Sequence, residues 1–302
     1  MRFELSRGDA MLASSRPVLA HLLTSGDQLL FSDEILARIR GMASHCARQL
    51  LDAVATENNE IDRERLLAKH SDALVETILS DDAFLLHAHA LALEAHWADR
   101  LQQRSGLDPV LPPFLQQLAA SPVAETAASA IHVLAAQARF VQTQRRMELP
   151  LGELPGELFH RVLMALRSCE YLPEQAGQQA EATLRRSFDE GKSRVGQIDR
   201  LLTALEGKVS NALAIDNAGL SLFTSALAIS TDQDRDVAVM SLGENQLARL
   251  ALSLRAAGLS QSAVEAQFLL LHPEISLPPG FDGITAARAA DLLATPKLAG
   301  GY

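Results

Sequence analysis

The chain has 302 residues, of which 48% are hydrophobic and 21% are charged, and its formal net charge is −10. This is the composition of a globular protein with a sizeable core, and it excludes a disordered chain. The acidic balance and the lack of any run of more than two Lys or Arg residues argue against a nucleic-acid partner. No apolar stretch reaches the roughly 18 residues of a membrane span, and the N-terminus lacks the apolar region of a signal peptide. We therefore expect a cytoplasmic protein that does not bind a membrane.

Apolar residues recur at three- and four-residue spacing along nearly the whole chain. The period-two alternation that marks a strand is almost absent. The pattern predicts an all-α protein of about ten to thirteen helices, packed as antiparallel pairs in two lobes.

The N-terminal half contains five expected helices and one short one. They cover residues 9–24, 33–55, 61–79 and 82–104, a short segment after Pro112-Pro113, and a long segment from Pro122 to Arg146. Residues 148–157 contain two prolines and two glycines, which cannot continue a helix. We place the domain boundary here, between an N-terminal helical lobe, 1–148, and a C-terminal helical lobe, 149–302.

The C-terminal lobe is expected to begin with helices over 155–170 and 174–206, the second interrupted at Gly191. Further on, residues 217–242 and 244–269 align at an offset of 27 and each read as helix, turn, helix. True repetition and a shared helical period both account for the match. Repeated helix pairs would stack, because one pair cannot bury its apolar face alone.

The stretch from Gln246 to Pro273 resembles uncharacterised bacterial all-helical proteins with HEAT-like helix pairs. The resemblance covers the C-terminal third at most. It implies an architecture, and it brings no catalytic residue with it.

The densest cluster of titratable residues is His87, His89, Glu94, His96 and Asp99. His89 and His96 share a helix face, but two metal ligands from one helix usually stand three or four residues apart. We interpret the three histidines as ordinary, partly exposed side chains. A metal site completed from another helix is the alternative. No cofactor is expected.

His160 lies on a helix that a second long helix follows. The arrangement loosely resembles the dimerisation helices of sensor histidine kinases, in which a helical His is phosphorylated. Some of these kinases carry an Asn where Met164 stands, and no Gly-rich ATP-binding domain follows here. His160 is therefore either a structural boundary or interface residue, or the site of a phosphotransfer module.

Arg145 and Arg146 end the long helix that precedes the acidic, proline-bearing segment. Cations are favourable at a helix C-terminus through the helix dipole alone. A hinge in which one of them binds Glu148, Glu153 or a partner's carboxylate is a second interpretation, and anion binding is a third.

The two cysteines, Cys46 and Cys169, follow no metal or redox spacing, and we interpret both as small buried hydrophobes.

We predict a non-enzymatic protein that acts by protein–protein interaction or as a regulatory helical scaffold, with a protein partner. The alternative is a phosphotransfer signalling protein that uses His160, or less favourably His89 or His96. A helical enzyme with a metal or lipid-like ligand is a third hypothesis. Homodimerisation through the helices of 156–206 remains an open option.

Overall fold

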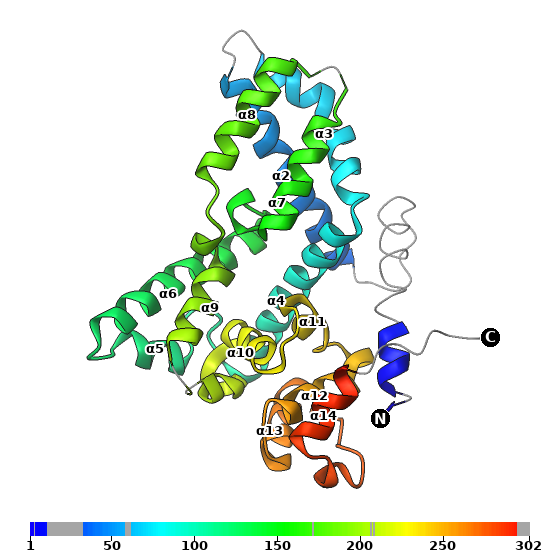
Figure 1. Ribbon diagram of the computed structural model, residues 1–302, viewed down its shortest axis with the longest axis vertical. Helices are drawn as coiled ribbons and strands as arrows, with labels where there is room; N and C mark the ends of the chain where they lie inside the picture. The colour runs from blue at the N-terminus through cyan, green and yellow to red at the C-terminus, as the bar shows by residue number, and fades with distance from the viewer. Residues whose placement is uncertain are drawn as a thin grey trace, which may run out of the picture. The chain divides into compact units, whose positions relative to one another are not determined.

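The computed structural model describes residues 1–2, 4–10, 33–57, 62–170, 172–205, 207 and 209–294. In these ranges every regular element is a helix and no residue lies in a strand (Figure 1). The all-α prediction is confirmed. No helix of these ranges combines the length and the apolar character that crossing a membrane would need.

The α-helices that carry labels in the figures follow in chain order: α2 Asp33–Glu57, α3 Arg63–Leu79, α4 Asp82–Ser105, α5 Pro113–Ala119, α6 Ala124–Arg145, α7 Gly156–Arg167, α8 Glu174–Ser187, α9 Arg194–Ala204, α10 Ile215–Thr231, α11 Arg235–Met240, α12 Leu247–Ala256, α13 Gln261–Leu271 and α14 Ala286–Ala294. Short 3₁₀ turns lie at Leu151–Glu153, Glu190–Lys192, Val209–Leu213, Glu244–Gln246 and Phe281–Gly283. Residues 4–10 are helical, and the rest of the helix expected over 9–24 lies outside the described residues.

The internal contacts group the chain into two compact units, each made of separate segments. Unit 1 holds the described residues of Met1–Ser15, Leu93–Ala138 and Gln197–Tyr302. Unit 2 holds those of Arg16–Ala92 and Arg139–Gly196. The chain passes from one unit to the other within α4, α6 and α9. The division into lobes 1–148 and 149–302 stays a prediction.

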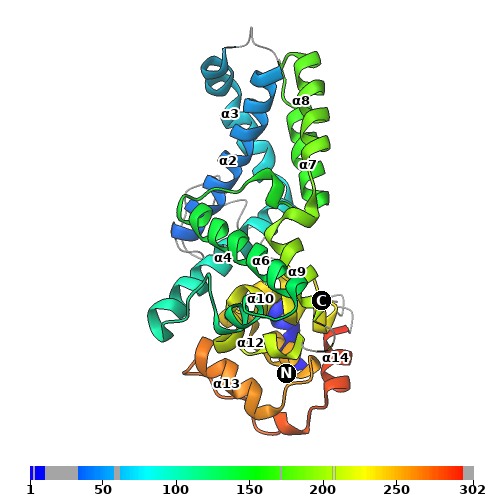
Figure 2. The same cartoon turned by 90° about the vertical axis from the view of Figure 1, so that its left-hand side faces the viewer.

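The core of unit 2 is built from α2, α3, α7 and α8, which lie side by side (Figures 1 and 2). One face of α2 is fully buried at Ile39, Met42, Cys46 and Leu50, each 0% exposed. These residues follow the three- and four-residue spacing of a helix that packs one face against a core. The expectation of a buried small hydrophobe is confirmed for Cys46 and wrong for Cys169, which is only half-buried.

A tight left-handed turn ends α6 and starts the Pro-rich segment. The carbonyl of Thr143 accepts the N–H of Glu148 at 2.8 Å, and that of Gln144 accepts the N–H of Met147 at 3.1 Å. Met147 has φ +57°. These bonds form the Schellman arrangement, with a methionine at the position that usually carries glycine. Gly41 of α2 makes room for this turn, since a Cβ there would lie 2.6 Å from the Met147 Cβ.

The helix expected over 174–206 is two helices, α8 and α9, separated around Gly191. Asp189 Oδ1 accepts the N–H of Gly191 at 3.1 Å and so holds a 3₁₀ turn there. The Glu153 carboxylate accepts the N–H of Arg194, the first residue of α9, at 2.7 Å. Phe188, between the helices, stacks on Phe159 with ring centroids 4.0 Å apart. The side-chain acceptors for these N–H groups stabilise the break.

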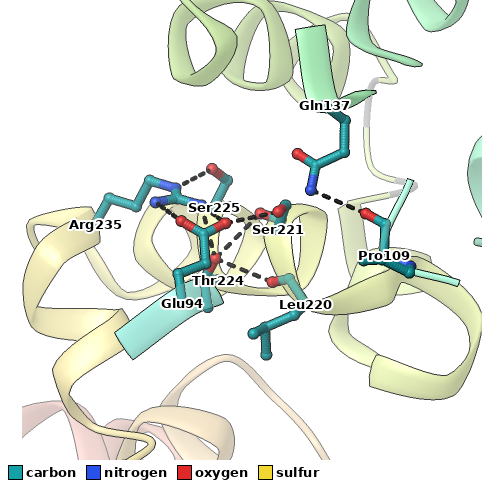
Figure 3. Close-up of polar contacts among 8 residues, drawn as sticks. All are labelled: Glu94, Pro109, Gln137, Leu220, Ser221, Thr224, Ser225 and Arg235. Atoms are coloured by element: carbon teal, nitrogen blue, oxygen red, sulfur yellow. Dashed lines mark hydrogen bonds and ion pairs between the residues drawn. The ribbon is translucent and has the colours of Figure 1, made fainter. Parts of the chain in front are cut away.

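Unit 1 is organised around α10, which packs against α5, α11, α12 and α13. Gly219 has φ +69° inside α10 and lies against Pro112, so a Cβ there would be 2.9 Å from the proline ring. Gln137 of α6 donates to the Pro109 carbonyl at 2.9 Å and holds the neighbouring loop (Figure 3).

The two segments that align at an offset of 27 both contain a helix, a turn and a second helix. The pair α10 and α11 has 17 and 6 residues, whereas α12 and α13 have 10 and 11. HEAT-like repetition stays a prediction.

Candidate functional site

A buried polar cluster of unit 1 joins α4, α10 and α11 around Glu94 (Figure 3). Arg235 binds both carboxylate oxygens of Glu94, from Nη1 to Oε2 at 2.9 Å and from Nη2 to Oε1 at 2.8 Å. Ser221 Oγ donates to Oε1 at 2.6 Å. The side chain of Glu94 is 1% exposed and that of Arg235 is 11% exposed. The pair is therefore a bidentate ion pair shielded from water.

Two hydroxyl groups of α10 also accept hydrogen bonds from Arg235. Its Nε donates to Ser225 Oγ at 3.0 Å and its Nη2 to Thr224 Oγ1 at 3.1 Å. Burial lowers the pKa of the Arg235 guanidinium. The charge and hydrogen bonds of Glu94, together with the charges of Asp236 and Asp199, more than reverse this, so the net pKa is raised. The carboxylate and the guanidinium neutralise each other in place, and the cluster ties three helices of unit 1 together.

His87 and His89 lie in the interior, 5% and 3% exposed, so their interpretation as partly exposed side chains is wrong. Their part of α4 is largely buried. Burial lowers the pKa of His89 to about 4, which leaves its ring neutral at pH 7. His96 is half-buried and meets the edge of the Trp97 ring, with centroids 6.5 Å apart. Over the described residues, no group of three or more His, Cys, Asp or Glu is placed to hold a metal ion.

His160 is exposed on α7, and its Nδ1 lies 2.9 Å from Nη2 of Arg185 on α8. Arginine can only donate, so Nδ1 accepts and the neutral ring carries its hydrogen on Nε2. A phosphoryl acceptor needs a lone pair on the attacking nitrogen. The nucleophilic nitrogen of His160 is therefore the one that Arg185 occupies, and phosphotransfer would require Arg185 to move away.

Arg185 is itself held by Glu181, whose Oε1 accepts its Nε at 2.7 Å and Nη2 of Arg167 at 2.8 Å. Burial raises the pKa of Glu181, and the two arginines more than reverse this, so the net pKa lies below its ordinary value. A role of His160 in phosphotransfer stays a prediction. Equal labelling of wild type and His160→Ala by phosphorylated response-regulator domains would eliminate it.

Arg145 and Arg146 are both exposed at the end of α6, and neither forms a side-chain ion pair with a described residue. Glu148 instead lies 3.7 Å from Arg48 of α2. Glu153 accepts the backbone N–H of Arg194, as described above. Arg146, but not Arg145, lines a pocket of about 250 Å³ in unit 2.

An exposed apolar strip runs along the part of α6 that belongs to unit 1. Ile131 is 54% exposed, and Val123, just before the helix, is 57% exposed. Ala124, Ala128 and Ala135 are also exposed, and together with Ile131 they follow a four-three-four spacing. This spacing places the four side chains on one face of the helix. We call Val123, Ala124, Ala128, Ile131 and Ala135 the α6 face.

A larger pocket, of about 410 Å³, also lies in unit 1, beside α12 and residues 275–278. Its apolar lining includes Leu247, Ala251 and Phe268, and Glu4 and Arg7 add charged groups.

Comparison of the chain with protein-family models, with characterised proteins and with solved structures finds no match.

The sequence patterns do not link Arg235 to Glu94, or Arg194 to Arg139 and Arg146. Arg235 is 141 residues from Glu94, so no local spacing links the two. Arg139 and Arg194 line the same pocket as Arg146 although Arg194 lies on another helix. The only available signal was that the Arg139–Arg146 helix end precedes an acidic, Pro-rich segment.

Proposed function

We propose that the protein is a non-enzymatic, regulatory binding protein of the cytoplasm that recognises a helix of a protein partner through the α6 face. The observation that carries the proposal is the exposure of Val123 and Ile131, 57% and 54%, next to a row of exposed alanines. Exposed apolar side chains that gather along one helix face are typical of interaction sites.

The spacing of the α6 face supports a helical occupant. Apolar residues at alternating intervals of three and four form the seam along which two helices pack. Small residues on either side of Ile131 allow a second helix to approach closely, with the isoleucine as the large side chain at the centre. A partner with a matching apolar strip would bury Ile131, the kind of central anchor that dominates binding energy.

The test is the affinity of the purified protein for its captured and identified partner. Ile131→Asp should weaken binding at least about 30-fold, because it would place a carboxylate at the centre of an apolar contact. Leu269→Asp is the matched control, since Leu269 is 68% exposed on a different helix, α13. Circular dichroism should show equal helicity for all three proteins.

Equal affinities of wild type and Ile131→Asp would reject the proposal. Equal losses in Ile131→Asp and Leu269→Asp would reject it as well, because the effect would not depend on the α6 face. If the occupant is a second copy of the chain, Ile131→Asp instead converts a dimer in solution into a monomer.

A further inference from the structure

The pocket of about 250 Å³ in unit 2 is lined by three arginines from separate positions. Arg139 and Arg146 come from the last turns of α6 and the turn after it, and both are exposed. Arg194, at the start of α9, is 1% exposed and lies over the Phe140 ring, with its guanidinium carbon 3.6 Å from the ring centroid. Arg194 is thus a buried cation in the wall, held by a cation–π contact.

The charge of the pocket is opposite to that of the chain. Three arginines and one carboxylate, that of Glu153, line it, whereas the whole chain carries a net charge of −10. The Glu153 carboxylate already accepts the N–H of Arg194 at 2.7 Å, which offsets part of its negative charge. Positive charge concentrated in a concave site attracts anions.

The guanidinium groups of Arg139 and Arg146 are available for a ligand. Neither has a hydrogen-bond or ion-pair partner for its side chain within the described part of the chain. Arginine presents a planar set of donors that matches phosphate and carboxylate oxygens, and it binds them in a bidentate manner.

The end of α6 would normally repel an anion, because unpaired carbonyls make a helix C-terminus negative. Here the last carbonyls are engaged. Thr143 O accepts from the backbone N–H groups of Arg146 and Glu148, and Gln144 O accepts from Met147 N–H and from Arg38 Nη1. The left-handed turn at Met147 thereby caps these carbonyls and weakens the repulsion of an anion.

An unsatisfied buried atom is a second, independent indication of a ligand. Gln144 lines the pocket and is 3% exposed, and its Oε1 has no hydrogen-bond partner. The Gln144 Nε2 has only the thioether of Met42, at 3.4 Å. A buried amide with no strong partner costs free energy unless something else binds it. An amide that rotates toward the pocket could accept from a ligand hydroxyl through Oε1 or donate to a ligand oxygen through Nε2.

We propose that this pocket binds a small organic anion through a phosphate or carboxylate group, gripped by Arg139 and Arg146 against the fixed charge of Arg194. The volume lies just below the range of roughly 300–1,000 Å³ that is usual for sites of drug-sized ligands. It therefore suits one small metabolite rather than a nucleic-acid strand or a peptide. The inference concerns unit 2 and does not depend on the α6 face.

The test is isothermal titration calorimetry of the full chain with inorganic phosphate, pyrophosphate and succinate. We expect saturable binding that weakens as ionic strength rises from about 0.01 M to about 0.15 M, where screening becomes strong. Arg139→Ala and Arg146→Ala should each weaken binding on the order of tenfold, because each removes a charged hydrogen-bond donor set. Arg145→Ala is the matched control, since it removes the same charge from the neighbouring residue outside the pocket.

Tighter binding of phosphate or pyrophosphate than of succinate would identify a phosphate-bearing ligand, and the reverse order a carboxylate-bearing one. Absence of saturable binding of all three probes would overturn the inference. Equal losses in Arg145→Ala and Arg146→Ala would also overturn it, because they would indicate general attraction rather than the pocket.

Discussion

Replacing Glu94 by methionine should destabilise unit 1 by about 3–5 kcal/mol, since it leaves the Arg235 guanidinium buried without its carboxylate. Breaking this ion pair should cost much stability because the Glu94 side chain is only 1% exposed. It also accepts two hydrogen bonds from Arg235, of 2.8 and 2.9 Å. Arg235→Met should cost a similar amount, because the buried carboxylate then loses both of its hydrogen bonds to a cation. Either loss is a large share of the roughly 5–15 kcal/mol that holds a typical domain folded.

The double variant Glu94→Met/Arg235→Met should cost less than the sum of the two single changes. The double variant leaves no buried charge without its counter-charge. Its remaining cost comes from hydroxyl groups that lose a hydrogen-bond partner, about 1–3 kcal/mol for each one left unsatisfied. A double-mutant cycle should therefore give a coupling free energy of several kcal/mol, well above the roughly 0.5 kcal/mol expected for independent sites.

The assay is urea unfolding followed by the fluorescence of Trp97, the single tryptophan, which lies in unit 1 and so reports on the unit that holds the pair. Arg288→Gln is the control, because it breaks an exposed 3.9 Å pair on α14 and should cost less than about 1 kcal/mol. Additive single and double effects, or a Glu94→Met cost no larger than that of the control, would refute the reasoning.

Three further results are expected. Burial lowers the pKa of His89 to about 4, below the value of about 6.5 for an unfolded chain, so the unfolded state takes up the proton first. The free energy of unfolding should therefore fall by about 3 kcal/mol as the pH drops from 6.5 to 4. Urea unfolding of His89→Gln should show a flatter dependence of this free energy on pH. Burial also raises the pKa of the Cys46 thiol, which is 0% exposed, so iodoacetamide should label Cys46 only after unfolding, whereas half-buried Cys169 should react slowly in the native protein; equal native rates would contradict this. Gly41→Ala should destabilise by about 1–3 kcal/mol, because the new Cβ would meet the left-handed turn after α6 at 2.6 Å. Gly177→Ala in α8, where a Cβ would have no neighbour within 4 Å, should instead stabilise by up to about 1 kcal/mol, and a thermal melt distinguishes the two.

Helix periodicity predicted those elements whose local signals agree with their packing. The expected helix over 33–55 is α2, whose buried positions repeat every three or four residues. The short helix after Pro112 is α5, with proline at its first position. The long helix was expected to start at Pro122, but α6 begins at Ala124, and Ser121 Oγ accepts the N–H of Val123 in the preceding turn.

Other features depend on contacts between residues far apart in the chain, which local patterns do not encode. The break between α8 and α9 is held partly by Glu153, 41 residues before Arg194. His87 and His89 are buried because other parts of the fold cover this side of α4. The spacing of polar residues along one helix does not show which of its sides will be covered. Glu94 belongs to a titratable cluster in the sequence, and the structure pairs it with Arg235, which lies 141 residues further along the chain.

The most direct test of the proposed interaction is site-specific crosslinking in the native host, with a photoreactive residue at position 131 or, for comparison, at position 269. Both positions carry exposed apolar side chains, 54% and 68% exposed, but only the first belongs to the α6 face. The account predicts one crosslinked species, to an identified partner, from position 131 and none from position 269. The same products from both positions, or none from position 131 while the protein is folded, would contradict it.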